Sequence, residues 1–216
     1  MTLSGTLIER ARLAYVRCVQ ERLSEHVFTI EDNNYSENAI DVFILSVTAL
    51  EAFINEAAFS PMARSTSRLA MVGDMLEDLD IRRKYVLVPQ LAWGQTYDPG
   101  VQPYQDFEML VRLRNDLVHY KMKFYSHGQE PGYAKTLSQR GLLLLPKPPD
   151  LQARFPWPTE LLTSKAALWA HNTACRMVRS FIAMADEETT ELHGSLANNF
   201  REIPLDYWKT ILEAST

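Results

Sequence analysis

The residues whose types and spacing suit chemistry lie in one stretch, residues 111–120, which reads VRLRNDLVHY. At 100° per residue on a helix, Asn115 and His119 share one side, with Arg112 and Glu108 nearby. A histidine titrates near neutral pH and can transfer a proton, and an arginine presents a forked positive charge to phosphoryl oxygens. These residue types therefore suit proton transfer beside a phosphate group.

Arg114 falls instead within the apolar arc of the same predicted helix, about one turn after Leu110. A buried guanidinium is costly unless it is paired. The preceding part of the chain offers Glu51 at the edge of another apolar helix stripe, with Asn55 one turn further on. We therefore expect Arg114 to be buried next to Glu51 or Asn55. A purely structural pair of Arg114 and Glu51, with His119 on the surface, is the alternative interpretation.

The pattern R-N-x-x-x-H at residues 114–119, together with ALEAFINE at residues 49–56, resembles the HEPN superfamily, the higher-eukaryote and prokaryote nucleotide-binding domain. That family is marked by an arginine and a histidine a few residues apart, often with a polar residue after the arginine. Here Asn115 is that polar residue. The resemblance covers residues 1–125 and the last long predicted helix.

The resemblance implies an antiparallel helical bundle that forms a homodimer. Many members are metal-independent endoribonucleases of toxin–antitoxin, abortive-infection or CRISPR-linked defence systems, so an RNA substrate and a cognate antitoxin or defence protein are implied partners. Carried over by position, Arg114 and His119 form the catalytic pair, Asn115 assists them, and Glu51 and Asn55 support them. Other members have lost catalysis, so a nucleotide- or protein-binding module is the main alternative. A helical interaction protein without a ligand is a third.

The implied reaction is chemically consistent with these side chains. Cleavage without a metal requires the 2′-hydroxyl to attack the adjacent phosphate, giving a 2′,3′-cyclic phosphate and a 5′-hydroxyl. A positioned histidine contributes about 10²–10⁴ in rate to such a proton transfer. Because the motif supplies one histidine per chain, a two-fold dimer would bring two such pairs into one cleft.

The elements that must position these residues are predicted to be helices almost throughout. Glycine is scarce, with 8 in 216 residues, and no run shows clean strand alternation. Apolar periodicity predicts helices over residues 3–26, 37–59, 67–93, 103–124, 159–185 and 205–213. The third is expected to break near residues 78–80 or at Pro89, and Asp106 suits the positive end of the fourth. The expected fold is all-α: a single HEPN-like domain over residues 1–216.

Residues 126–158 are predicted to form a long irregular insertion, because they contain six of the eleven prolines. Residues 121–158 carry six basic and two acidic side chains, which gives a local charge of +4, whereas the whole chain has −5. A solvated loop without a partner is the alternative to an RNA contact. The candidate RNA-binding residues are Lys121, Lys123, Lys135, Arg140 and Lys147.

The amino-acid composition restricts the classes of protein to which the chain can belong. Hydrophobic residues make up 46% and charged residues 23%, as in an ordinary globular protein. Two cysteines, Cys18 and Cys175, make no disulfide framework, which favours a reduced cytoplasmic setting. Acidic residues interrupt the apolar stretch at residues 40–59, so no membrane span is expected. No cofactor is expected, and no metal site, because histidine and cysteine show no ligand spacing. His171 is expected to be a core or interface residue.

Overall fold

A computed structural model describes residues 2–24, 36–59, 67–119, 123–125, 132–142, 155–157, 162–185 and 197–214. The chain is mostly helical, as predicted. Its helices are α1 (Leu3–Ser24), α2 (Asn38–Phe59), α3 (Ser67–Glu77), α4 (Ile81–Trp93), α5 (Tyr104–Val118), α6 (Gly132–Gln139), α7 (Ser164–Ile182) and α9 (Tyr207–Ala214). Two short strands, β1 (Lys123–Tyr125) and β2 (Phe155–Trp157), complete the described elements.

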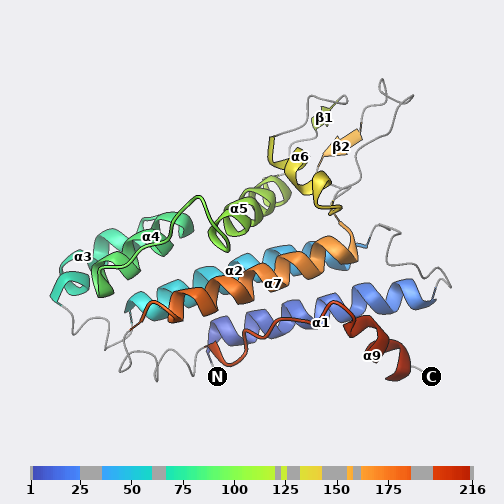
Figure 1. The fold of residues 1–216 in the computed structure, drawn as a ribbon, viewed down its shortest axis with the longest axis horizontal. Helices are drawn as coiled ribbons and strands as arrows, with labels where there is room; N and C mark the ends of the chain where they lie inside the picture. Colours follow the sequence, from blue (N-terminus) through green and yellow to red (C-terminus); the bar gives the residue numbers. More distant parts are fainter. Residues whose placement is uncertain are drawn as a thin grey trace.

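Helix α2 forms the centre of the helical bundle (Figure 1). It packs against α1, α7, α5 and α4, and in Figure 1 α1 lies below it and α4 and α5 lie above it. The ring of Phe53 meets the rings of Phe181 and Phe200 edge-on, at centroid distances of 5.5 and 5.7 Å. Among the described helices, α2 alone has the length and apolarity to cross a membrane, and its buried place in the bundle accounts for that composition.

The third predicted helix breaks at residues 78–80, which is one of the two expected places. Asp80 is the N-cap of α4, and its Oδ1 accepts the backbone N–H groups of Arg82 and Arg83 at 2.9 and 3.2 Å. These two bonds satisfy donors that a helix start leaves free. Pro89 lies inside α4 without ending it. The capping carboxylate, rather than the proline, therefore sets the break.

Two predictions about the chain after α5 are wrong. The fourth helix was expected to reach residue 124, but α5 ends at Val118 and β1 follows. Residues 126–158 are not wholly irregular, because they include α6 and β2, and β2 pairs with β1 in antiparallel register. A three-residue strand is too short to show alternation, and its partner lies far away in sequence. In α6, the buried pair Ala134 and Leu137 has helical spacing, which the surrounding prolines obscured.

Candidate functional site

Arg114 lies near the end of α5 and contacts α2 through Glu51. The Nη2 atom of Arg114 is 3.6 Å from Oε2 of Glu51, and the two side chains are 20% and 45% exposed. This contact confirms the pairing expected from the position of Arg114 on its helix. The Nε atom of Arg114 is buried and has no hydrogen-bond partner among the described residues. The guanidinium is thus held in place while part of its donor capacity is unused.

Asn115 and His119 come together at the carboxyl end of α5. His119 is the C-cap residue, and its backbone N–H donates to the Asn115 carbonyl at 2.9 Å. His119 is exposed and Asn115 is partly buried. The structure therefore places the three motif residues within the last turn and a half of one helix. The histidine faces solvent, whereas the arginine is held against the bundle.

Asn55, expected to support the motif, contacts a different cation. Its Oδ1 accepts a hydrogen bond from Nζ of Lys84 at 2.9 Å. The same Nζ donates to the carbonyl of Glu77 at 3.2 Å, and Lys84 is almost fully buried. Of the two partners expected for Arg114, the structure thus selects Glu51. Asn55 joins α2 to α4 instead, and satisfies a buried ammonium group.

The predicted RNA-binding residues have different environments. Lys135 is exposed on α6, and Arg140 follows that helix and pairs through Nη1 with Oδ1 of Asp106. Lys123 is the first residue of β1, but its side chain lies outside the described part of the structure. Lys121 and Lys147 lie outside the described residues altogether. The insertion therefore contributes one anchored arginine and one solvent-exposed lysine to the described surface.

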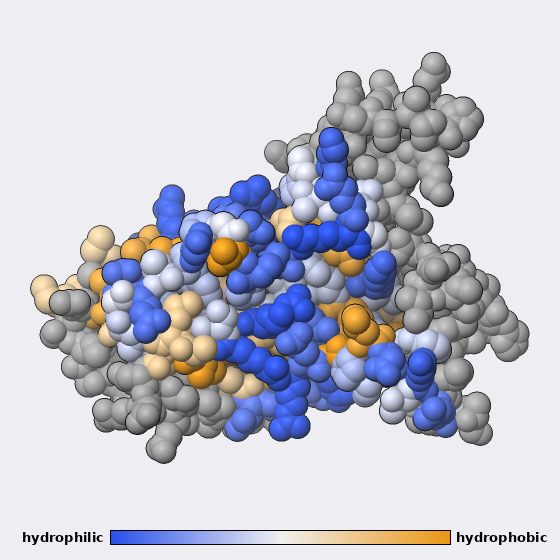
Figure 2. Space-filling view, viewed as in Figure 1, coloured by the Kyte–Doolittle hydropathy of each residue, from blue (hydrophilic) through white to orange (hydrophobic). Residues whose placement is uncertain are grey.

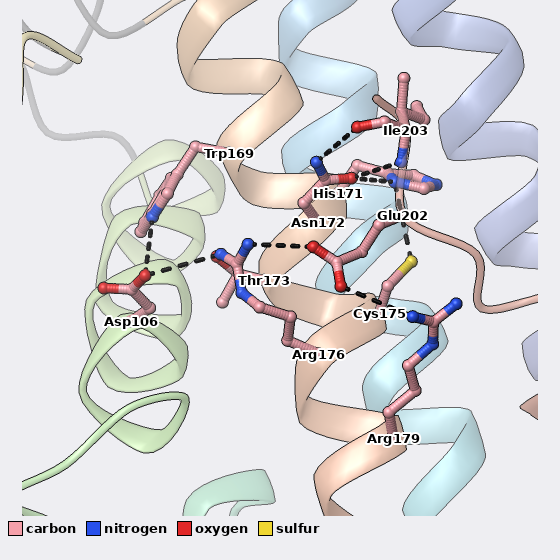
Figure 3. Close-up of polar contacts among 10 residues, drawn as sticks. All are labelled: Asp106, Trp169, His171, Asn172, Thr173, Cys175, Arg176, Arg179, Glu202 and Ile203. Atoms are coloured by element: carbon pink, nitrogen blue, oxygen red, sulfur yellow. Dashed lines mark hydrogen bonds and ion pairs between the residues drawn. The ribbon is translucent and has the colours of Figure 1, made fainter. Parts of the chain in front are cut away.

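Asp106 is the centre of a polar cluster that joins three parts of the chain (Figure 3). The residue is only 6% exposed. Besides the pair with Arg140, its Oδ2 accepts Nε1–H of Trp169 at 3.2 Å and lies 3.7 Å from Nη2 of Arg176. Gln102 donates to Oδ1 at 3.0 Å. A buried carboxylate needs such partners. The sequence offered one signal for this cluster, because Asp106 is an acidic residue among apolar neighbours. That position was interpreted only as favourable for the helix dipole, so the cluster was missed.

The same cluster contacts residues 197–206, the C-terminal segment that precedes α9, through Glu202. Arg176 Nη1 lies 3.2 Å from Oε2 of Glu202, and Arg179 Nη1 lies 3.6 Å from Oε1 (Figure 3). Next to this pair, Asn172 exchanges two hydrogen bonds of 2.8 Å with the backbone of Ile203. Figure 2 shows hydrophilic residues gathered across the middle of this face, over α7. The arrangement ties the C-terminal segment to the bundle, which is a structural role.

His171 and the two cysteines are core groups. His171 is buried in the core, one of the two environments expected for it. Desolvation lowers its pKa to about 4. Its Nδ1 lies 3.7 Å from Sγ of Cys175. Burial raises the pKa of Cys175 to about 12 and that of Cys18 to about 11. A neutral imidazole and two protonated thiols are poor acid–base groups at neutral pH.

Two grooves flank α5. One, of about 520 Å³, lies between α5 and α6, and its lining includes Arg112, Tyr133 and Arg140. The other, of about 440 Å³, lies between α4 and α5, and its lining includes Leu87 and Tyr104. Glu108 lines both grooves, so they adjoin one another along α5. Among the described side chains, no group of three or more His, Cys, Asp or Glu is placed to hold a metal ion.

Comparison of the chain with protein-family models, with curated proteins and with solved structures finds no match. The resemblance to HEPN domains therefore rests on the R-N-x-x-x-H pattern and on the ALEAFINE segment. The contact of Arg114 with Glu51 joins those two segments in space. Function has to be argued from the site itself.

Proposed function

We propose that this protein is a metal-independent endoribonuclease of HEPN type that acts as a symmetric dimer in the cytoplasm, in a defence or toxin–antitoxin setting. The observation that carries the proposal is the state of Arg114. Its guanidinium is held 3.6 Å from Glu51 and keeps a buried Nε without an acceptor. One turn and a half along the same helix, His119 is exposed to solvent. A fixed cation and an exposed imidazole at the end of one helix are two groups that phosphodiester cleavage without a metal can use.

The proposed reaction uses one His119 from each subunit. One imidazole takes the proton of the 2′-hydroxyl as its oxygen attacks phosphorus, and the P–O5′ bond breaks. The other imidazole protonates the departing 5′-oxygen. Arg114 stabilises the negative charge that gathers on the phosphoryl oxygens. Asn115 lies one turn before His119 on the same side of α5, where its side chain assists the pair.

A catalytically silent nucleotide- or protein-binding module is the second candidate. Two observations favour it. The Glu51 carboxylate offsets part of the charge of Arg114, and the chain as a whole carries −5. Both weaken the attraction to a polyanion. In this alternative the motif binds a nucleotide or a protein partner without cleaving RNA.

The deciding experiment is cleavage of a structured RNA by the purified protein in the presence of EDTA. We expect fragments that end in a 2′,3′-cyclic phosphate, and we expect His119→Ala to abolish them. The matched control is Val118→Ala, since Val118 is an exposed neighbour at the same helix end. Cleavage that survives His119→Ala, or that requires Mg²⁺, would contradict the proposal. RNA binding without any cleavage by the wild type would favour the binding module.

A further inference from the structure

The groove between α5 and α6 has the size and the side chains of a binding site for a small polar group. Its volume of about 520 Å³ lies within the range of about 300–1,000 Å³ that ligand sites occupy. Most of the side chains that line it are polar, and Pro99 and Met109 complete the lining. The side chains that matter are Gln105, Glu108 and Arg112 from α5, and Tyr133, Thr136 and Arg140 from α6 and its end.

Arg112 is the cation in this groove that is available to a ligand. Its Nη2 lies 3.8 Å from Oε2 of Glu108, and its side chain is 51% exposed. Such an exposed pair is worth little and exchanges partners at low cost. Arg140, by contrast, is anchored by the buried Asp106. A phosphate entering the groove would therefore meet one arginine that can turn towards it and one that is already fixed.

Tyr133 supplies an aromatic wall to the same groove. Its hydroxyl donates to Oδ2 of Asp116, which holds the side chain against α5. Aromatic side chains bind unpaired nucleobases by stacking, and sites for single strands combine them with arginines. Gln105 and Thr136 add hydrogen-bonding groups that a base or a ribose can use.

The groove shares one face of α5 with Asn115 and His119, whereas Arg114 faces α2. His119 is seven positions after Arg112, so the two residues differ by about 20° around the helix and by about 10 Å along its axis. Asp116, which holds Tyr133, lies between them next to Asn115. One extended strand can thus pass from the groove to His119 without crossing the helix.

We propose that this groove binds one nucleotide of a single-stranded RNA segment, with its phosphate at Arg112 and its base against Tyr133, while the phosphate to be cleaved lies at His119. This inference rests on the proposed function, because it places the RNA on the face that carries His119. It makes the α6 insertion part of the substrate site. Glu108 then acts as a competitor that the phosphate displaces from Arg112.

Binding of a labelled single-stranded oligoribonucleotide of about eight nucleotides tests the groove. The protein carries His119→Ala throughout, so that no cleavage disturbs the measurement. We expect Arg112→Gln to weaken binding about tenfold and to lower the slope of log K against log salt by about 0.7. The control Arg17→Gln should change neither. Arg17 is 56% exposed on α1 and lies 4.0 Å from Asp41, which closely matches the pair made by Arg112.

Two further variants test the aromatic wall and the competing carboxylate. Tyr133→Leu should weaken binding about tenfold, whereas Tyr133→Phe should keep the ring and the affinity. Glu108→Gln should tighten binding severalfold, because it releases Arg112. Melting temperatures within a few degrees of the parent ensure that each variant is folded. If Tyr133→Leu does not fold, the conservative Tyr133→Phe variant still tests whether the ring alone is enough for binding.

The outcomes separate the groove from the proposed function. The proposed groove site is wrong if neither Arg112→Gln nor Tyr133→Leu changes the affinity for RNA. It is also wrong if Arg17→Gln weakens RNA binding as much as Arg112→Gln does, or if the protein binds no RNA at all. If the groove is wrong for either of the first two reasons, RNA cleavage that depends on His119 would still support the proposed nuclease. Binding that depends on the groove in a protein that cleaves no RNA supports the inference and rejects the nuclease.

Discussion

Glu51 of α2 and Arg114 of α5 are joined by a contact of 3.6 Å between Oε2 and Nη2. They lie far apart in sequence, and each sits at the edge of its helix's apolar face. Because Glu51 is nearly half exposed, water can replace Arg114 as its partner. The pair is therefore not a sealed ion pair of the core. It orients the guanidinium at modest energetic cost, and the Arg114 side chain stays 20% exposed.

The stability contribution of this pair can be measured with a double-mutant cycle. We expect the coupling between Glu51→Gln and Arg114→Gln to be about 0.5–1 kcal/mol in urea unfolding, since both partners retain contact with solvent. A coupling of several kcal/mol would mean that the pair is desolvated in solution. RNA cleavage should respond more strongly than stability, because Glu51→Gln frees the guanidinium to leave its position.

The buried carboxylate of Asp106 should matter much more for stability. Asp106→Asn keeps the shape of the side chain but removes the charge that Arg140 and Arg176 share. We expect a loss of about 2 kcal/mol, less than for a sealed pair because both arginines are about one-third exposed. Urea unfolding measures this loss of folding free energy. The control is Asp41→Asn at an exposed position, which should change the folding free energy by no more than about 0.5 kcal/mol. Equal midpoints for the two variants would contradict a central role for Asp106.

The parts of the fold that local periodicity specifies were predictable. Helices α1, α2 and α7 repeat apolar residues every three or four positions over about five to six turns. The periodicity of the fourth helix indicated that Arg114 faces the bundle, so a contact with Glu51 or Asn55 was expected, and the structure shows the one with Glu51. The R-N-x-x-x-H pattern indicated residues 114–119 as the candidate site, and the function of that site is a proposal.

The remaining features depend on partners that are distant in sequence. Strand β1 exists because it pairs with β2, whose residues lie 30 to 34 positions later in the chain than their partners. Asp106 is stabilised by Trp169 and Arg176, and no spacing rule links α5 with α7. The groove likewise requires α6 to lie against α5. Periodicity reports which face of a helix is buried, but it does not report which polar side chain from another element reaches it.

His171 should make folding stability depend on pH. Desolvation lowers its pKa from the ordinary value of 6.5 to about 4, so below pH 6.5 the unfolded chain binds a proton that the folded chain excludes. The contribution of His171 is fully present above pH 6.5 and is lost as the pH falls towards 4. From pH 7 to pH 4.5, wild type should lose on the order of 2 kcal/mol more than His171→Gln in urea unfolding. Parallel losses in the two proteins would show that the histidine is hydrated.

The C-terminal segment should be released when Asn172 is removed. Asn172 satisfies both the N–H and the C=O of Ile203, and both residues are buried. Asn172→Ala leaves these backbone groups without partners, at a cost of about 2 kcal/mol. Local opening should then make trypsin cleavage after the exposed Arg201 about thirtyfold faster, as mass spectrometry of the released peptide would measure.

Two controls distinguish local release from a general loss of stability. Asn198→Ala changes an exposed asparagine in the same segment and should leave the cleavage rate after Arg201 unchanged. Asn172→Asp keeps an acceptor for the Ile203 N–H but places a negative charge beside its carbonyl, so it should be at least as susceptible as Asn172→Ala. If Asn172→Ala is cut no faster after Arg201 than Asn198→Ala is, then Phe200, which packs its ring against Phe53, holds the segment without the asparagine.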